Sequence, residues 1–330
     1  MSLIRQAVID VGTNSVKLLV ADVAGHEVQP VCEKSKQTRL GQGFFETHRL
    51  QFESIVATAA AASRYADEAR SLKAESIRII ATSAARDATN ASELVAAILD
   101  ATDLPLEIIT GDQEADWVFQ GVTTDPELAQ VPLLLLDVGG GSTEFILGQG
   151  EKKHFRQSFR LGTVRLMETI PPSDPPTPAE VTETRQWIQD FIAKKVAPEL
   201  QPALRREVEL NAAHRPVAMV GTGGTTSILA RMESQLEDYD RARIEATRLS
   251  LDRVRWHSER LWALPLAERQ EIVGLPRKRA DVILGGVAII QAVMECLGFR
   301  ELRVSTRGLR FAALMNEPAN ASAPEERLHQ

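Results

Sequence analysis

The chain contains two closely similar segments, and each has the pattern of a strand, a tight glycine turn and a second strand. Residues 10–20 read DVGTNSVKLLV and residues 137–147 read DVGGGSTEFIL. An apolar run precedes each copy, and an Asp ends the first strand in both. Their separation is too long for one unit of a solenoid. The pattern therefore predicts two related domains whose glycine turns face each other across a cleft.

The predicted strands and helices alternate along both halves of the chain. Helices with apolar residues at helical spacing follow the strands around each turn. This order is typical of an α/β fold in which helices cover a sheet. A tail at 316–330, poor in apolar residues, is expected to fray. Strands are predicted within 7–36 and at 77–81, 106–109, 133–137, 143–148, 153–159, 217–220 and 302–304. Helices are predicted at 51–71, 93–99, 112–120, from 164, at 179–195, in the segment between the strand at 217–220 and residue 297, and at 307–315. Ser92 is a possible N-cap of the helix at 93–99.

Charge and composition exclude several kinds of partner. The net charge of −7 argues against broad binding of nucleic acid, so a polyanion would need local arginines, backbone amides or a metal ion. The longest apolar stretch, 131–136, is too short to span a bilayer. Cys32 and Cys296 match no metal or redox spacing and are expected to be reduced thiols. We therefore expect a cytoplasmic protein that binds neither nucleic acid nor a membrane.

Three glycine clusters have the composition of phosphate-binding turns. Glycine lets backbone N–H groups approach an anion closely, and hydroxyl or amide side chains add donors. A plain hairpin is the alternative at the first cluster, but the second has three consecutive glycines where a hairpin needs one or two. The third opens a helix, whose N-terminal amides attract anions, although a tight strand-to-helix turn explains it equally well. The predicted phosphate-binding residues are Gly12, Thr13, Asn14 and Ser15, then Gly139, Gly140, Gly141, Ser142 and Thr143, and finally Gly223 and Gly224.

Three acidic residues are predicted to hold a metal ion. Asp10 and Asp137 end the strands before the first two turns, and Glu144 lies on the strand that leaves the second turn. Mg²⁺ or Mn²⁺ takes one or two such carboxylates together with phosphate oxygens and water. Turn capping is the alternative role for these acids.

Arg86 and Glu114 are further candidates. Arg86 follows a predicted strand, as an arginine that clamps a phosphate would. Glu114 stands in the first turn of a predicted helix, where an acid also suits the helix dipole. Thr110 and Gln113 fit a capping box there, so the residues alone favour a structural role for Glu114. Weaker candidates for phosphate binding are Arg39, Arg165 and Arg310.

Six segments taken together resemble the exopolyphosphatase/guanosine pentaphosphate phosphatase (Ppx/GppA) family of the actin-like superfamily. The two turn segments fit any member of that superfamily, whereas the GxxEA and RADxI segments are specific to the family. Thr306 and Phe311 depart from the family pattern, which has an acid and a Glu there, and the chain stops where longer members continue into a helical domain. These departures bear on the binding of long chains and not on the core reaction. The segments are AVIDVGTNS at 7–15, ATSAARDATN at 81–90, GDQEA at 111–115, LDVGGGSTE at 136–144, GTGGT at 221–225 and RADVILGG at 279–286.

The resemblance implies two ribonuclease-H-like α/β domains with a cleft between them, residues 1–126 with about 306–330 forming the first and 127–305 the second. It implies Mg²⁺-dependent hydrolysis of the terminal phosphate of inorganic polyphosphate. Glu114 then becomes the catalytic glutamate, while Asp137 and Glu144 organise metal or water. Three alternatives stay open: the same chemistry on guanosine penta- or tetraphosphate, a nucleotide-binding regulator with vestigial activity, and a kinase of the superfamily. The apolar segment 283–293 fits either the core or the face of a homodimer.

Overall fold

The first half of the chain forms a five-stranded sheet. The computed structural model describes residues 3–210 and 216–316, so the tail predicted to fray lies outside the described residues from 317 onward. The strand order is β3-β2-β1-β4-β5, with β1, β2 and β3 antiparallel and β4 and β5 parallel to β1. The strands are β1 (Ile4–Val11), β2 (Ser15–Ala24), β3 (Glu27–Gln37), β4 (Ser76–Ala81) and β5 (Leu106–Ile108).

The second half repeats this topology and adds one edge strand. Its order is β10-β11-β9-β6-β7-β8, in which β6, β7 and β8 are antiparallel and β9 and β11 run parallel to β6. Strands β6, β7, β8, β9 and β11 therefore correspond to β1 to β5, and the internal repeat is confirmed as a duplicated sheet. The strands are β6 (Leu133–Val138), β7 (Thr143–Gln149), β8 (Lys152–Phe159), β9 (Ala218–Thr222), β10 (Arg248–Ser250) and β11 (Glu301–Val304).

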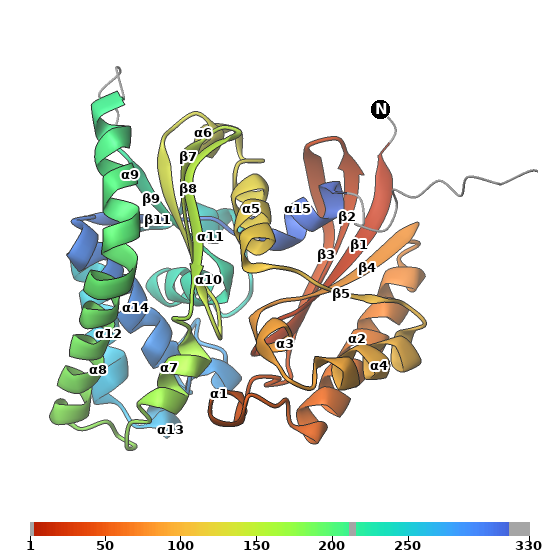
Figure 1. Cartoon of the computed structure of the whole chain (residues 1–330), viewed down its shortest axis with the longest axis horizontal. Coiled ribbons are helices and arrows are strands. Elements are labelled where there is room, and N and C mark those ends of the chain that lie inside the picture. The colour runs from red at the N-terminus through yellow and green to blue at the C-terminus, as the bar shows by residue number, and fades with distance from the viewer. Residues whose placement is uncertain (1–2, 211–215, 317–330) are drawn as a thin grey trace, which may run out of the picture.

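Helices cover both faces of each sheet, and two of them lie between the sheets (Figure 1). Helices α5 (Gly111–Val122) and α15 (Leu309–Met315) pack on each other, and their buried residues join those of both sheets in one apolar cluster. Helices α2 (Phe52–Ser71) and α4 (Ala91–Thr102) cover the outer face of the first sheet. Burial of these apolar faces is the main force that fixes the two sheets relative to α5 and α15.

The outer face of the second sheet is covered by α8 (Pro178–Phe191), α12 (Leu251–Ala263) and α14 (Ile283–Leu297). All residues of α14 from Ile283 to Met294 are buried, so the apolar segment 283–293 belongs to the core and not to an exposed face. The remaining helices are α1 (Phe44–Thr47), α3 (Ser83–Asp87), α6 (Pro126–Ala129), α7 (Thr163–Thr169), a π-helical turn (Ile192–Val196), α9 (Ala197–Leu210), α10 (Gly223–Glu233), α11 (Arg241–Ala246), α13 (Leu266–Arg269) and a 3₁₀ turn (Arg277–Arg279).

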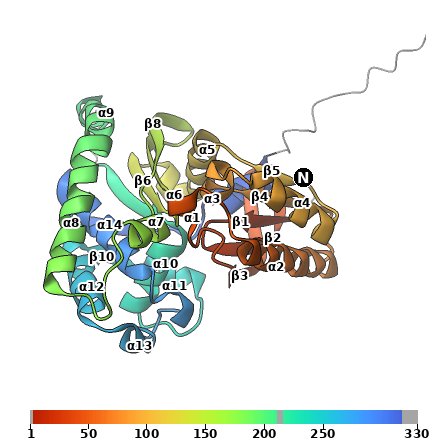
Figure 2. The ribbon, with the colours of Figure 1, turned by 60° about the horizontal axis from the view of Figure 1, so that its bottom comes forward.

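The two halves also meet through α1 and α7, which lie next to each other in both views (Figures 1 and 2). The N–H of Gly43 donates to Oε1 of Glu168 at 2.7 Å across this junction. The domain boundaries at 127 and about 306 stay a prediction, although the strands of each sheet fall on either side of residue 127. In the described parts of the chain, no helix has the length and apolar character that crossing a membrane requires.

Several details differ from the prediction. Helices α1, α3, α6 and α9 were not predicted. Strand β10 was missed; it has three residues and depends on pairing with β11, which no local pattern signals. Helix α4 begins at Ala91, so Ser92 is not its N-cap. Asn90 precedes the helix, and its side chain bonds the backbone N–H and carbonyl of Leu50 instead of capping.

Candidate active site

The two predicted glycine turns have the same geometry. In the first turn the N–H of Gly12 donates to the carbonyl of Ser15 at 3.0 Å, and in the second the N–H of Gly139 donates to the carbonyl of Ser142 at 2.9 Å. Each turn connects the first two strands of its sheet. The sequence repeat is therefore also a repeat in three dimensions.

The two turns approach each other so closely that side chains would not fit at the second. A Cβ atom placed on Gly140 would lie 2.8 Å from Cβ of Thr13, and one on Gly141 would lie 2.5 Å from Oγ of Ser83 and 3.2 Å from Oγ1 of Thr13. The second and third glycines of the triplet are thus explained by contact between the two halves. A hairpin alone would not need them.

A cleft of about 650 Å³ runs between the turns. Most of the predicted site residues lie on its wall, and the exceptions are Arg86 and Thr143. The predicted residues that line the cleft are Asp10, Gly12, Thr13, Asn14, Ser15, Glu114, Asp137, Gly139, Gly140, Gly141, Ser142, Glu144, Gly223 and Gly224.

Thr143 faces away from the cleft. Its hydroxyl donates to the carbonyl of Leu161, and the residue is fully buried. The prediction of a phosphate contact for Thr143 is corrected accordingly, because side chains alternate along a strand and the neighbouring Ser142 and Glu144 take the cleft side.

Arg86 also lies off the cleft wall. Its Nη1 donates to Oε2 of Glu114 at 2.9 Å and to the carbonyl of Ile109 at 3.2 Å. In place of the predicted phosphate contact, the structure gives Arg86 a contact with Glu114. Thr110 caps α5 by accepting from the N–H of Gln113 at 3.1 Å, but the side chain of Gln113 donates to Glu107 at 3.5 Å, so only half of the predicted capping box forms. The carboxylate of Glu114 lines the cleft.

Four carboxylates meet on the cleft wall. Asp10 and Glu114 come from the first half, and Asp137 and Glu144 from the second. Glu144 is 1% exposed, and its Oε1 accepts from Oγ of Ser142 at 2.8 Å and from Oγ of Ser158 at 2.7 Å. A buried carboxylate held by two neutral hydroxyls keeps most of its negative charge uncompensated.

Burial and mutual repulsion raise the pKa values of three of these acids. Burial raises the pKa of Glu114 to about 7, Arg86 opposes the rise, and Asp137 and Asp10 add to it. Burial also raises the pKa of Asp137 to about 6, against the effect of Lys17. The pKa of Glu144 is held well above its usual range by burial and then by Glu114 and Asp137. Arg86 and Lys17 therefore compensate the charge of these carboxylates only in part.

The oxygen donors of these acids fit a hard cation whose coordination is completed by water and by phosphate oxygens of a ligand. No group of three or more His, Cys, Asp or Glu residues within 3–210 and 216–316 is arranged to enclose a metal ion. Mg²⁺ does not need such an enclosure, because it takes one or two carboxylates and fills its remaining positions with water and phosphate oxygens. Uncompensated oxygen ligands at Asp137 and Glu144 suit that mode of binding.

The third glycine cluster completes the cleft wall beside Asp137. Gly223 begins α10 directly after β9 and has a φ of +82°. A Cβ atom there would lie 2.1 Å from Oδ1 of Asp137, so a glycine is required both by the backbone and by the carboxylate.

Comparison with known proteins assigns this site to a family. The model of the Ppx/GppA phosphatase family matches residues 19–317. The chain belongs to the Ppx/GppA phosphatase family. It is 36% identical over 318 residues to exopolyphosphatase 2 of Mycobacterium tuberculosis, covering 92% of this chain and 96% of the relative. It is 29% identical to a guanosine-5′-triphosphate,3′-diphosphate pyrophosphatase of Vibrio cholerae, covering 92% of this chain and 57% of that protein.

Solved structures of the family have the same fold. An exopolyphosphatase from Cytophaga hutchinsonii superposes with a TM-score of 0.81 at 25% identity, covering 94% of this chain and 96% of that one. The Aquifex aeolicus PPX-GPPA enzyme superposes with a TM-score of 0.75 at 30% identity, covering 96% and 100%. The resemblance inferred from the six segments is confirmed, and with it the two-sheet α/β fold.

Sequence reasoning missed most of the basic residues of this Ppx/GppA cleft. Two short runs carried the signal, KSK at 34–36 on β3 and RKR at 277–279. Of the weaker candidates, Arg310 lines the cleft, Arg165 donates to the carbonyl of Gly141 at 2.8 Å, and Arg39 pairs with Asp281 at 2.8 Å. The basic residues on the wall are Lys17, Lys34, Lys36, Arg231, Arg277, Lys278, Arg279 and Arg310.

Proposed function

We propose that the protein is an exopolyphosphatase, which hydrolyses the terminal phosphoanhydride bond of linear inorganic polyphosphate with the help of Mg²⁺. One observation carries the proposal: a cleft between two glycine turns has a floor of four carboxylates and a wall rich in Lys and Arg. A chain of phosphates needs the basic wall, and its cleavage needs an activated water and a cation at the acidic floor. The 36% identity to an exopolyphosphatase over nearly the whole of both chains supports the same substrate.

Each part of the site has a role in this reaction. Backbone N–H groups of the turns at 12–15 and 139–142 bind phosphate oxygens as anion-binding nests, apart from those of Gly12 and Gly139, which bond within the turns. Asp137, with Glu144 and Asp10, would hold Mg²⁺, which when bound neutralises charge on the transferred phosphoryl group. Glu114 orients the attacking water and takes its proton, and Arg86 positions Glu114. The pKa of Glu114, about 7, suits a general base, because such a base works best when its pKa is near the operating pH.

A phosphate-release assay tests the proposal. Long polyphosphate, tripolyphosphate, guanosine pentaphosphate and ATP are each supplied with and without Mg²⁺. We expect release from polyphosphate to be the fastest and to stop when Mg²⁺ is chelated. Faster release from guanosine pentaphosphate would show that this nucleotide, and not polyphosphate, is the substrate. Nucleotide binding without any phosphate release would indicate a regulator and not an enzyme. Transfer of phosphate to an alcohol in preference to water would indicate a kinase.

A further inference from the structure

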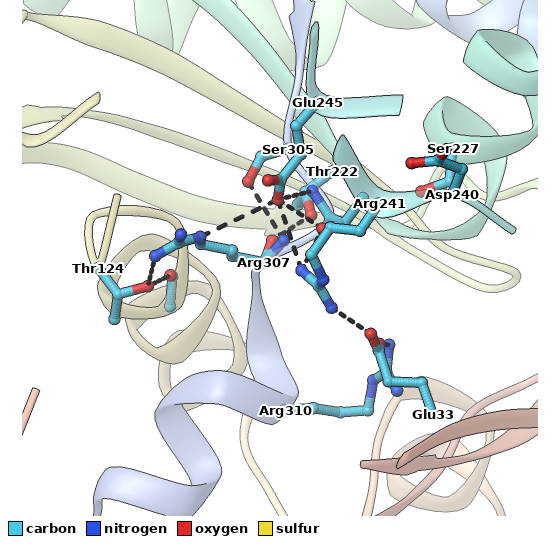
Figure 3. A network of polar contacts seen from close by, with 12 residues as sticks. Glu33, Thr124, Thr222, Ser227, Asp240, Arg241, Glu245, Ser305, Arg307 and Arg310 are labelled. Carbon is cyan, nitrogen blue, oxygen red and sulfur yellow. Dashed lines mark hydrogen bonds and ion pairs between the residues drawn. The ribbon is translucent and has the colours of Figure 1, made fainter. Parts of the chain in front are cut away.

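Glu33 is a carboxylate on the cleft wall that is held by two arginines from distant parts of the chain (Figure 3). Arg241 of α11 donates from Nη2 to Oε1 of Glu33, and Arg310 of α15 donates from Nη2 to Oε2 at 3.2 Å. The three side chains are between 16% and 23% exposed. The carboxylate of Glu33 is therefore an anion bound between two guanidinium groups. Glu33 and Arg310 line the cleft that is proposed to take a polyanion, and Arg241 contacts Glu33 from outside that lining.

Both arginines are anchored by contacts other than Glu33. Nη1 of Arg310 donates to the carbonyl of Leu18 at 2.9 Å. Nη1 of Arg241 donates to Oγ1 of Thr306, and its guanidinium lies 5.1 Å from the centre of the Phe311 ring. If Glu33 turned away, these contacts would keep the two guanidinium groups in place beside the space it had left.

The charges around Glu33 favour an anion there. Arg307 joins the cluster through a 4.0 Å contact with Glu245, which also lies 3.4 Å from Arg241 (Figure 3). Three arginines thus face two glutamates, which leaves one positive charge in excess. Displacement of Glu33 raises that excess to two, since Glu245 stays bound to Thr306.

Glu33 lies at a distance from the reacting end of the cleft. It is on the edge strand β3, which is separated from β1 and Asp10 by β2. Two strand spacings amount to about 10 Å across the sheet. An anion at this position would therefore belong to an inner part of the substrate and not to the phosphate that is cleaved.

We propose that Arg241 and Arg310 form a second anion subsite, which binds an inner phosphate of a long polyphosphate chain, and that the carboxylate of Glu33 occupies this subsite until the chain displaces it. The inference rests on the proposed function, because it takes a linear phosphate chain as the ligand. Arginine forks bind carboxylate and phosphate oxygens with the same geometry, so one can replace the other. Glu33 then favours long chains as substrates, because only a long chain reaches the two arginines and can displace the carboxylate of Glu33 from them.

The decisive variant is Glu33→Gln, because it predicts a gain that misfolding cannot mimic. We expect its KM for long polyphosphate to fall by roughly tenfold, as a competing charge-assisted hydrogen bond is removed. The KM for tripolyphosphate and the kcat for both substrates stay at the wild-type values. Glu93→Gln is the matched control, since Glu93 is likewise paired with arginine, in this case Arg49 alone at 3.0 Å, but on an exposed surface.

Arg310→Gln gives the opposite result, a rise of roughly tenfold in the KM for long polyphosphate. The KM for tripolyphosphate rises less, through the loss of the charge of Arg310 near Asp137. Arg310→Lys, which keeps the charge and loses the fork, falls between that variant and the wild type. Equal changes for both chain lengths, or no change in Glu33→Gln, would overturn the subsite and leave Glu33 as a structural ion pair. Calorimetric binding of the same two chains needs no turnover, so it tests the subsite even if the protein hydrolyses neither.

Discussion

Nη1 of Arg86 donates a hydrogen bond of 2.9 Å to Oε2 of Glu114 and so joins α3 to the first turn of α5. The two residues come from different strand-to-helix connections, after β4 and near β5, and meet because those strands are neighbours in the sheet. Burial raises the pKa of Glu114 and Arg86 lowers it, and the resulting pKa is about 7. The pair thus orients the carboxylate and holds its pKa near neutrality, as a general base requires.

Glu114→Gln should reduce the kcat for polyphosphate by roughly 10²–10⁴-fold, the usual contribution of a general base. The amide keeps the size of the side chain but cannot accept the proton of water. Binding of polyphosphate, measured by calorimetry, should persist because the turns and basic residues are unchanged. Asp112→Asn, an exposed acid in the same helical turn, is the control and should keep full activity. Near-normal turnover by Glu114→Gln would show that Glu114 is not the general base.

Arg86→Gln should move the acidic limb of the pH–rate profile to higher pH. Arg86 lowers the pKa of Glu114, so its removal raises that pKa above about 7, and a base that must be deprotonated then needs a more alkaline solution. We expect a shift of about one pH unit, together with a lower plateau because Glu114 is less well oriented. Arg86→Lys should shift the limb less. An unchanged limb with a tenfold rise in KM would instead indicate direct contact with phosphate.

The location of the cleft could be predicted from the sequence because its signals are local. Asp10 and Asp137 each stand before a glycine turn, and the repeat of that pattern implies a repeat of the fold. The pairing of Arg86 with Glu114 could not be predicted in the same way, since it depends on the neighbouring positions of β4 and β5. Propensity and periodicity carry no information on which strands become neighbours.

The basic wall was missed for a different reason. A lone Lys or Arg in a sequence is most often a solvated surface residue, and Lys17 and Arg231 have no local pattern that marks them as cleft residues. Thr143 illustrates the converse error. It belongs to the glycine-rich segment, but the alternation of side chains along β7 directs its hydroxyl to Leu161. Composition identified the segment, and only the strand register decided which of its members face the cleft.

The stability that Glu114, Asp137 and Glu144 contribute in the absence of metal should fall as the pH rises from about 4 to 7. The raised pKa values of Glu114, Asp137 and Glu144 mean that the folded protein binds more protons than the unfolded chain in this range. Their contribution to stability is therefore complete at low pH and is lost as the pH passes through the folded-state pKa values. Asp137→Asn should stabilise the metal-free protein by about 1–2 kcal/mol at pH 7.5 and by a much smaller amount at pH 4.5.

Thermal unfolding in chelator and in Mg²⁺ measures this effect. Mg²⁺ should raise the Tm of the wild type at pH 7.5, because it binds only the folded state, and should raise that of Asp137→Asn much less. Asp100→Asn, an exposed acid on α4, is the control and should follow the wild type in both solutions. A Tm of Asp137→Asn below that of the wild type in chelator would show that the charge of this carboxylate does not destabilise the metal-free protein.

Gly141→Ala should separate the two turns and reduce kcat/KM by roughly 10²-fold, since displacements near 1 Å have that effect on positioned reactants. The new Cβ atom would lie 2.5 Å from Oγ of Ser83 and 3.2 Å from both Cβ of Ser83 and Oγ1 of Thr13, so the hydroxyl of Ser83 is the closest obstacle. Ser83→Ala in the same chain removes that hydroxyl and should restore a large part of the activity, although Ser83→Ala alone gains nothing. Phosphate release by the single and double variants decides the matter: if the second substitution restores no activity, the loss arises from the backbone of the turn and not from the distance between the two halves.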